Sequence, residues 1–149
     1  MKKRKNFTLI ELLVVVIIIS TLVSIATPTY FRVVERFRLV EATTVINDIR
    51  KAEEEVLIRK GRYSDNFSEL YIEIYDKNNQ LCSGKTCELK YFIIQIRLIT
   101  PTSYQILAQR KSDVTPPPQR YSPNYIYFYD SKTRSYLCND ANCAKDFLI

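Results

Sequence analysis

The chain has 149 residues, 46% apolar and 12% aromatic, and a chain of this length is expected to form one compact domain. Its 22 basic and 16 acidic residues give a net charge of +6, and it contains no His, no Trp and only two Gly. The lack of His excludes catalytic triads and histidine-based metal sites, and two glycines leave no glycine-rich phosphate loop.

The positive charge is concentrated at the amino terminus. Lys2, Lys3, Arg4 and Lys5 stand directly before a long apolar run. Basic residues in this position are typical of membrane-targeting segments and not of nucleic-acid-binding faces. We therefore expect a membrane contact and no nucleic-acid partner.

The apolar run extends from Phe7 to Ala26 and predicts a transmembrane helix. Twenty helical residues rise roughly 30 Å, which matches the hydrocarbon core of a bilayer. The positive-inside rule keeps the amino terminus cytoplasmic and exports the residues after Ala26. A secretory signal peptide cleaved after Ser24-Ile25-Ala26 is the alternative.

One acid, Glu11, lies within this run. An unpaired carboxylate inside a bilayer costs several kcal/mol, so it needs a proton or a partner. The first basic residue after the run is Arg32, which is too distant along the helix. The partner is therefore expected to be another molecule or a newly made amino terminus, unless Glu11 simply extends to the headgroups.

The residues Lys2 to Asn6 followed by Phe7-Thr8-Leu9-Ile10-Glu11-Leu12-Leu13 closely resemble the class III signal of type IV pilins and pseudopilins. The resemblance covers about the first 60 residues. It implies that a prepilin peptidase cleaves between Asn6 and Phe7 and methylates the new amino group of Phe7. It also implies that this amine pairs with Glu11 when a subunit docks onto its neighbour in a filament.

The sequence departs from the family immediately before the cleavage site. Family members have Gly, occasionally Ala, where this chain has Asn6. An uncleaved chain would remain a membrane-anchored protein, because its leader cations could not enter a filament core.

An amphipathic extension of the helix is predicted from residue 27 to 60, ending before Gly61. Its expected apolar stripe is Val33, Phe37, Val40 and Thr44, continued by Val45, Ile49, Ala52 and Val56. Pro28 lies inside this helix, where a kink or local unwinding is expected.

The remaining residues predict a short helix followed by an antiparallel β-meander. Ser64 or Asp65 is expected to cap a short segment over residues 66–71. Apolar and aromatic residues predict strands at 91–99, 103–109, 125–129 and 135–138, and the alternating tyrosines 125, 127 and 129 predict one half-buried sheet face. The expected fold class is α+β: a long helix packed on an antiparallel sheet, as the pilin resemblance also implies.

The four cysteines form two pairs with the same spacing, Cys82 with Cys87 and Cys138 with Cys143. Four cysteines allow three disulfide pairings, of which two local loops are favoured over cross-pairing of the loops. A four-cysteine zinc site is a further alternative. In many pilins a disulfide closes the carboxyl-terminal loop, so the resemblance implies the bond between Cys138 and Cys143.

The sequence thus predicts a leader (1–6), a membrane and assembly helix (7–26), its amphipathic extension (27–60) and a β head (61–149). The expected function is a structural subunit of a type IV pilus-like filament. We expect no enzymatic activity, cofactor or metal. Its expected partners are other pilin subunits, the prepilin peptidase and an inner-membrane assembly platform. The resemblance implies that it lies in the bacterial inner membrane before assembly and in the extracellular pilus afterwards.

Two other functions are kept as alternatives. One is a pseudopilin of a type II secretion machine, whose carboxyl-terminal loops typically hold calcium, for which Asp140 and Asp146 are the weak candidates. The other is an uncleaved, membrane-anchored surface or DNA-binding module.

Overall fold

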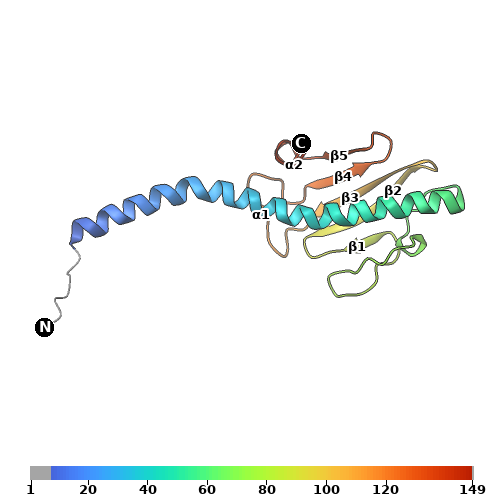
Figure 1. The fold of residues 1–149 in the computed structure, drawn as a ribbon, viewed down its shortest axis with the longest axis horizontal. Helices are drawn as coiled ribbons and strands as arrows, with labels where there is room; N and C mark the ends of the chain where they lie inside the picture. The colour runs from blue at the N-terminus through green and yellow to red at the C-terminus, as the bar shows by residue number, and fades with distance from the viewer. Residues whose placement is uncertain (1–7, 149) are drawn as a thin grey trace. The chain divides into compact units, whose positions relative to one another are not determined.

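The computed structural model describes residues 8–148, which divide into two compact units, one ending at Val34 and one beginning at Glu35. The helix α1 (Leu9–Lys60) contributes residues to both units (Figure 1). The carboxyl-terminal unit also contains the elements η1 (Phe67–Glu69), β1 (Thr86–Glu88), β2 (Phe92–Thr100), β3 (Ser103–Arg110), β4 (Ile126–Asp130), β5 (Ser135–Cys138) and α2 (Ala141–Phe147). The α+β fold with a long amino-terminal helix is therefore confirmed.

The amino-terminal unit is helical from Leu9 onward and exposes apolar side chains on every side. All residues from Thr8 to Val33 are exposed. By length and composition this part of α1 could cross a membrane.

The carboxyl-terminal unit contains one antiparallel sheet with the strand order β1-β2-β3-β4-β5. Each strand pairs with its neighbour in sequence, as expected of a meander. The four predicted strands are present with boundaries shifted by at most one residue. The strand β1 was not predicted, because three residues, Thr-Cys-Glu, give no readable alternation.

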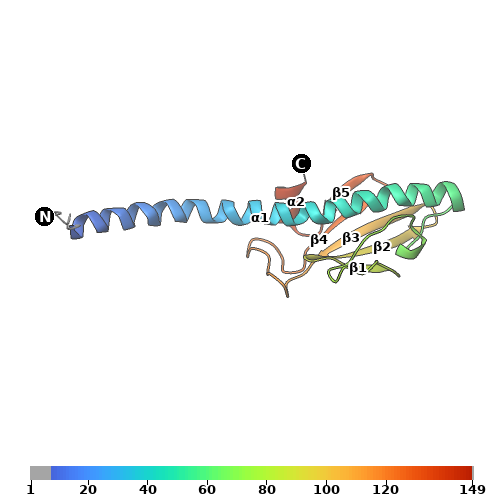
Figure 2. The same ribbon diagram turned by 60° about the horizontal axis from the view of Figure 1, so that its bottom comes forward.

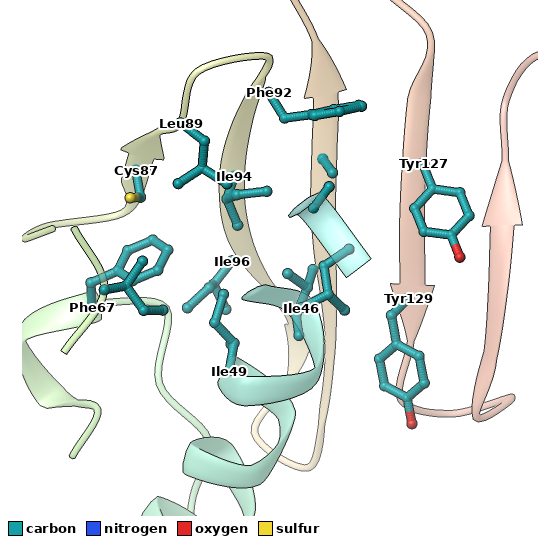
Figure 3. Packing of buried hydrophobic residues seen from close by; sticks show 14 of the residues in the cluster. Ile46, Ile49, Phe67, Cys87, Leu89, Phe92, Ile94, Ile96, Tyr127 and Tyr129 are labelled. Carbon is teal, nitrogen blue, oxygen red and sulfur yellow. The ribbon is translucent and has the colours of Figure 1, made fainter. Parts of the chain in front are cut away.

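The core lies between one face of the sheet and the part of α1 that begins at Glu35 (Figure 2). In Figure 3, Ile46 and Ile49 of α1 lie beside Ile94 and Ile96 of β2, and all four side chains are at most 1% exposed. Alternate residues of β2, β3 and β4 are buried, which is the pattern of a sheet covered on one face. The tyrosines 125, 127 and 129 are all buried, so the prediction that they form a sheet face is confirmed.

The prediction is wrong for the first half of the apolar stripe on the helix. Val33, Phe37 and Val40 are exposed, and the buried stripe consists instead of Glu35, Leu39, Ala42, Ile46 and Ile49. These residues are spaced four, three, four and three positions apart, as expected for one face of a helix. The pattern was not recognised in the sequence because its first residue, Glu35, is an acid. The second half, from Ile49 through Ala52 to Val56, is buried as predicted.

Local backbone signals explain where α1 ends and η1 begins. Gly61 has a φ of 70° and donates its N–H to the carbonyl of Leu57 at 2.8 Å, so it ends the helix as predicted. The residue that caps η1 is Asn66, whose side chain accepts from the N–H of Ser68. The prediction that Ser64 or Asp65 caps this segment is wrong, because Asn66 takes that position. The Ser64 hydroxyl instead accepts from the Asn66 N–H, and the Ser64 N–H donates to Glu53 of α1.

Candidate functional site

The amino-terminal end of α1 is closed by Thr8 and Glu11. The Thr8 N–H and the Thr8 hydroxyl both donate to Glu11 Oε2 at 2.9 Å. The Glu11 N–H donates back to Thr8 Oγ1 at 3.3 Å. This reciprocal arrangement is a capping box, which satisfies donors that the first helical turn leaves without partners.

The capping box gives Glu11 a hydrogen-bonding partner three residues away on its own helix. Thr8 is uncharged, so these hydrogen bonds do not neutralise the carboxylate, and the pairing of Glu11 with another molecule or a new amino terminus stays a prediction. Thr8 was the residue missed, although the Thr-x-x-Glu pattern before an apolar run was a readable signal. Both hydrogen bonds use Oε2, and no described residue donates a hydrogen bond to Oε1.

The predicted cleavage and methylation site lies outside the described residues. Asn6 and Phe7 both belong to the segment that precedes Thr8. Their processing therefore stays a prediction.

Polar side chains within the exposed apolar part of α1 are satisfied by the helix itself. Ser20 donates to the Val16 carbonyl at 2.6 Å, and Thr27 donates to the Val23 carbonyl at 2.7 Å. Internal satisfaction of this kind is what a hydrocarbon environment requires of hydroxyl groups.

Pro28 lies in the interior of α1, and the helix is unbroken through it. The local unwinding expected at this proline is therefore not found within the described helix. The kink at Pro28 stays a prediction.

A buried polar cluster joins α1 to the sheet in the carboxyl-terminal unit. Glu35 on α1 and Arg110 at the end of β3 form an ion pair in which Arg110 Nε donates to Glu35 Oε1 at 2.6 Å, with neither side chain exposed. The Tyr125 hydroxyl donates to the same oxygen at 2.8 Å, and Arg38 donates to Oε2 at 3.0 Å. Burial alone would raise the pKa of Glu35, but these hydrogen bonds outweigh it and lower the pKa.

Arg110 also secures the loop that follows β3. Its guanidinium donates to the carbonyl of Thr115 at 2.9 Å and to the carbonyl of Lys111. One buried side chain thus connects the helix, the sheet and the proline-rich loop. No sequence signal could have identified it, because its partner Glu35 is 75 residues away.

The carboxyl-terminal loop is closed by the disulfide between Cys138 and Cys143, whose Cα atoms are 6.1 Å apart. Asp140 caps the helix α2 by accepting from the Cys143 N–H at 2.8 Å. This short helix was not predicted, although Asp140 before Ala141 was a usable capping signal.

Asp146 anchors the end of α2. Its carboxylate accepts from Arg120 Nε at 2.7 Å and from the Tyr121 hydroxyl at 2.9 Å, and its main-chain carbonyl accepts from Arg36 of α1. Asp140 and Asp146, considered as calcium ligands in the sequence analysis, therefore serve as a helix cap and an ion-pair partner.

The second disulfide joins Cys82 to Cys87, with Cα atoms 5.3 Å apart. It closes the segment that leads into the edge strand β1. Both disulfides are the local ones, so within this structure neither a cross-paired framework nor a four-cysteine zinc site is formed by the four cysteines.

Comparisons with known proteins agree with the amino-terminal features. Residues 1–27 match the family described as the prokaryotic N-terminal methylation motif. The chain is 37% identical over 68 residues to the type IV major pilin protein PilA of Myxococcus xanthus (strain DK1622), a match that covers 46% of this chain. The match spans only 31% of that relative's length. No solved structure matches the chain significantly.

The matched motif covers the leader and the membrane helix on which the pilin resemblance rested, and it includes Thr8, Glu11 and residues 9–27 of α1. The resemblance to type IV pilins is confirmed for the amino-terminal part of the chain, which carries the N-terminal methylation motif and is similar to a type IV major pilin.

Proposed function

We propose that the chain is a structural subunit of an extracellular type IV pilus-like filament. Residues 1–6 form a leader that a prepilin peptidase removes, and the new amino group of Phe7 is methylated. Residues 7–26 form the membrane and assembly helix, 27–60 its amphipathic extension and 61–149 the surface-exposed head. The subunit has a structural role and no enzymatic one.

The exposed apolar part of α1 is the observation that carries this proposal. Large apolar side chains such as Leu9, Ile10, Leu22 and Ile25 are between 62% and 83% exposed. A surface of this kind needs lipid or other apolar helices around it in water. The inner membrane supplies the first cover before assembly, with the amino terminus cytoplasmic, and neighbouring pilin subunits supply the second within the filament.

The geometry at Glu11 supports a docking role for this acid. Its Oε2 is held by Thr8, which fixes the orientation of the carboxylate, and its Oε1 accepts no hydrogen bond from any described residue. The methylated α-amine of Phe7 on a neighbouring subunit is a cation that can pair with Oε1. Such a pair neutralises Glu11 in a low-dielectric environment. An inner-membrane assembly platform would bring the two subunits together.

Shearing of the native host tests the proposal. Wild-type chain should be detected by immunoblot in the sheared surface fraction, whereas a Glu11→Gln variant, which lacks the negative charge, should stay in the membrane fraction. Glu55→Gln is the matched control, because Glu55 is a partly exposed glutamate whose pair with Arg59 lies in the carboxyl-terminal unit. The proposal is wrong if wild type and Glu11→Gln distribute identically.

An uncleaved, membrane-anchored module is the second candidate, and Asn6 is the residue that favours it. It predicts full-length wild-type chain in the membrane and none in the sheared fraction. In that case Asn6→Gly should restore cleavage and change the fractionation.

A further inference from the structure

The carboxyl-terminal unit contains a hollow of about 550 Å³ that has no role in the assembly account. One side is formed by residues of α1 between Asn47 and Glu54, and the other by Tyr104 of β3, Tyr129 of β4 and Arg134 in the turn between β4 and β5. Its volume is within the range of pockets that bind small molecules.

The charges around this hollow favour an anion. Arg50, Lys51 and Arg134 line it together with a single acid, Glu54. Lys51 already contacts the carboxylate of Asp48 at 3.3 Å. Arg134, in contrast, is exposed and has no ion pair with any residue that the structure describes. Its guanidinium is therefore a cation available to a ligand.

Arg134 lies at a backbone position that is unfavourable for an arginine. Its φ is 53°, in the left-handed region where glycine and asparagine are favoured. An arginine here gains nothing from the turn geometry and contributes no ion pair within the described residues. A ligand that uses the guanidinium accounts for its presence.

Arg50 provides a second, pre-oriented guanidinium. It lies 4.0 Å above the centroid of the Tyr129 ring and donates to Asn47 Oδ1 at 3.0 Å. The Tyr136 hydroxyl donates to the same oxygen of Asn47 at 2.6 Å. Because both the ring and the amide hold it, Arg50 loses little conformational freedom when it binds a ligand.

Neutral and acidic groups in the same hollow suit hydroxyl groups on the ligand. The Tyr104 hydroxyl has no hydrogen-bond partner among the described residues. Glu54 accepts one hydrogen bond from the Tyr63 hydroxyl at 3.2 Å through Oε1, which leaves Oε2 to accept another. A carboxylate beside the cations disfavours a bare polyanion and favours an anion that also carries hydroxyl donors.

We propose that this hollow binds an acidic sugar, with Arg134 and Arg50 holding its carboxylate and with Glu54 and Tyr104 contacting its hydroxyl groups. The site lies within the carboxyl-terminal unit. Ligand binding to it can therefore be measured on the unassembled chain.

The test is a titration of the full-length chain in detergent micelles with glucuronate, glucose or inorganic phosphate, each in a separate experiment. Binding is measured from the change in chemical shift of the Arg50 Nε–H group in the NMR spectrum. We expect saturable shifts with glucuronate and at least tenfold weaker binding of glucose and phosphate. The Arg134→Asn variant, which tolerates a positive φ, should bind glucuronate at least tenfold more weakly. Lys132→Asn is the matched control, because it removes the same charge from the same turn outside the hollow and should change the affinity less than twofold.

A second variant addresses the hydroxyl contacts. Glu54→Gln should weaken glucuronate binding severalfold but leave phosphate binding no weaker, because it removes an acceptor and a negative charge. The proposal is overturned if glucuronate gives no saturable shift, if Arg134→Asn binds it as wild type does, or if inorganic phosphate binds equally well.

Discussion

Arg110 and Glu35 are in direct contact although they are 75 residues apart in the chain. Arg110 donates through Nε to Glu35 Oε1 at 2.6 Å and through Nη2 to Oε2 at 3.3 Å, and neither side chain is exposed. Both oxygens of the carboxylate are therefore hydrogen-bonded to one guanidinium. A buried pair of this kind adds little net stability over apolar residues, but it strongly penalises any change that leaves one charge alone. We infer that it fixes how residue 35 and the following turns of α1 lie on the sheet.

Glu35→Ala is therefore expected to reduce the free energy of unfolding of the carboxyl-terminal unit by about 3–5 kcal/mol, because Arg110 remains buried without its partner. Chemical denaturation of the full-length chain in detergent measures this loss. Glu55→Ala removes an exposed ion pair with Arg59 and should cost less than about 1 kcal/mol. Similar losses in the two variants would contradict the account of Glu35.

The contrast between Glu35 and Ile49 shows what the sequence could predict. Ile49 belongs to a run of apolar residues at helical spacing, so its burial follows from periodicity. Glu35 begins the same buried face, but an acid is normally assigned to the solvent side, and only the tertiary structure supplies Arg110. The sequence-based stripe was therefore displaced toward Val33 and Phe37, which are exposed.

Local sequence patterns likewise predicted some elements and missed others. The strands β2 to β5 were predicted because β-branched and aromatic residues alternate within them and Pro or Asp separates them. The capping box of Thr8 and Glu11 was also readable, but the acid was interpreted only as a buried charge. The helix α2 was missed because its seven residues, which include the disulfide-bonded Cys143, give too few helical turns for periodicity.

The pH dependence of stability is expected to come largely from Glu53. Burial raises the pKa of its carboxyl to about 7, and the nearby acids Glu54, Glu69 and Asp65 add to the effect. In the unfolded chain the same group ionises near pH 4.3. The raised pKa of Glu53 therefore contributes fully to the free energy of unfolding below about pH 4.3. This contribution, up to about 3 kcal/mol, is lost as the pH rises through 7.

The chain contains no His, so no imidazole titrates in the same pH range and masks the effect of Glu53 on stability. Denaturation midpoints of the full-length chain should fall between pH 5 and pH 7.5, and Glu53→Gln should leave only the part due to Glu41, whose pKa is also raised by burial. Glu73→Gln, at an exposed position, is the control and should keep the wild-type pH dependence. A stability that rises over this range would show that Glu53 is ionised in the folded chain.

The two disulfides should stabilise the chain to similar extents. Both join residues five positions apart, so they remove similar entropy from the unfolded chain. Replacing Cys138 and Cys143 by Ala, or Cys82 and Cys87 by Ala, is expected to cost about 2 kcal/mol in either case, measured by denaturation without reductant. No loss in either double variant would argue against this loop-closure account.

Thr8→Val tests the capping box at the start of α1. The variant keeps the shape of the side chain but loses the hydroxyl that accepts the Glu11 N–H, which should cost about 1 kcal/mol. Hydrogen exchange of the Glu11 amide in micelles should become roughly fivefold faster. Ser20→Ala is the control, because it removes only a hydroxyl donor to the Val16 carbonyl. It should leave the exchange rate of the Glu11 amide unchanged. Equal exchange in wild type and Thr8→Val would mean that Thr8 is not the effective cap.

The intact mass of the chain recovered from sheared surface filaments of the native host tests the central claim most directly. The account predicts a species that lacks Met1 to Asn6, carries one additional methyl group and contains both disulfides. A full-length mass confined to the membrane fraction, with no processed species in the sheared material, would contradict the filament function.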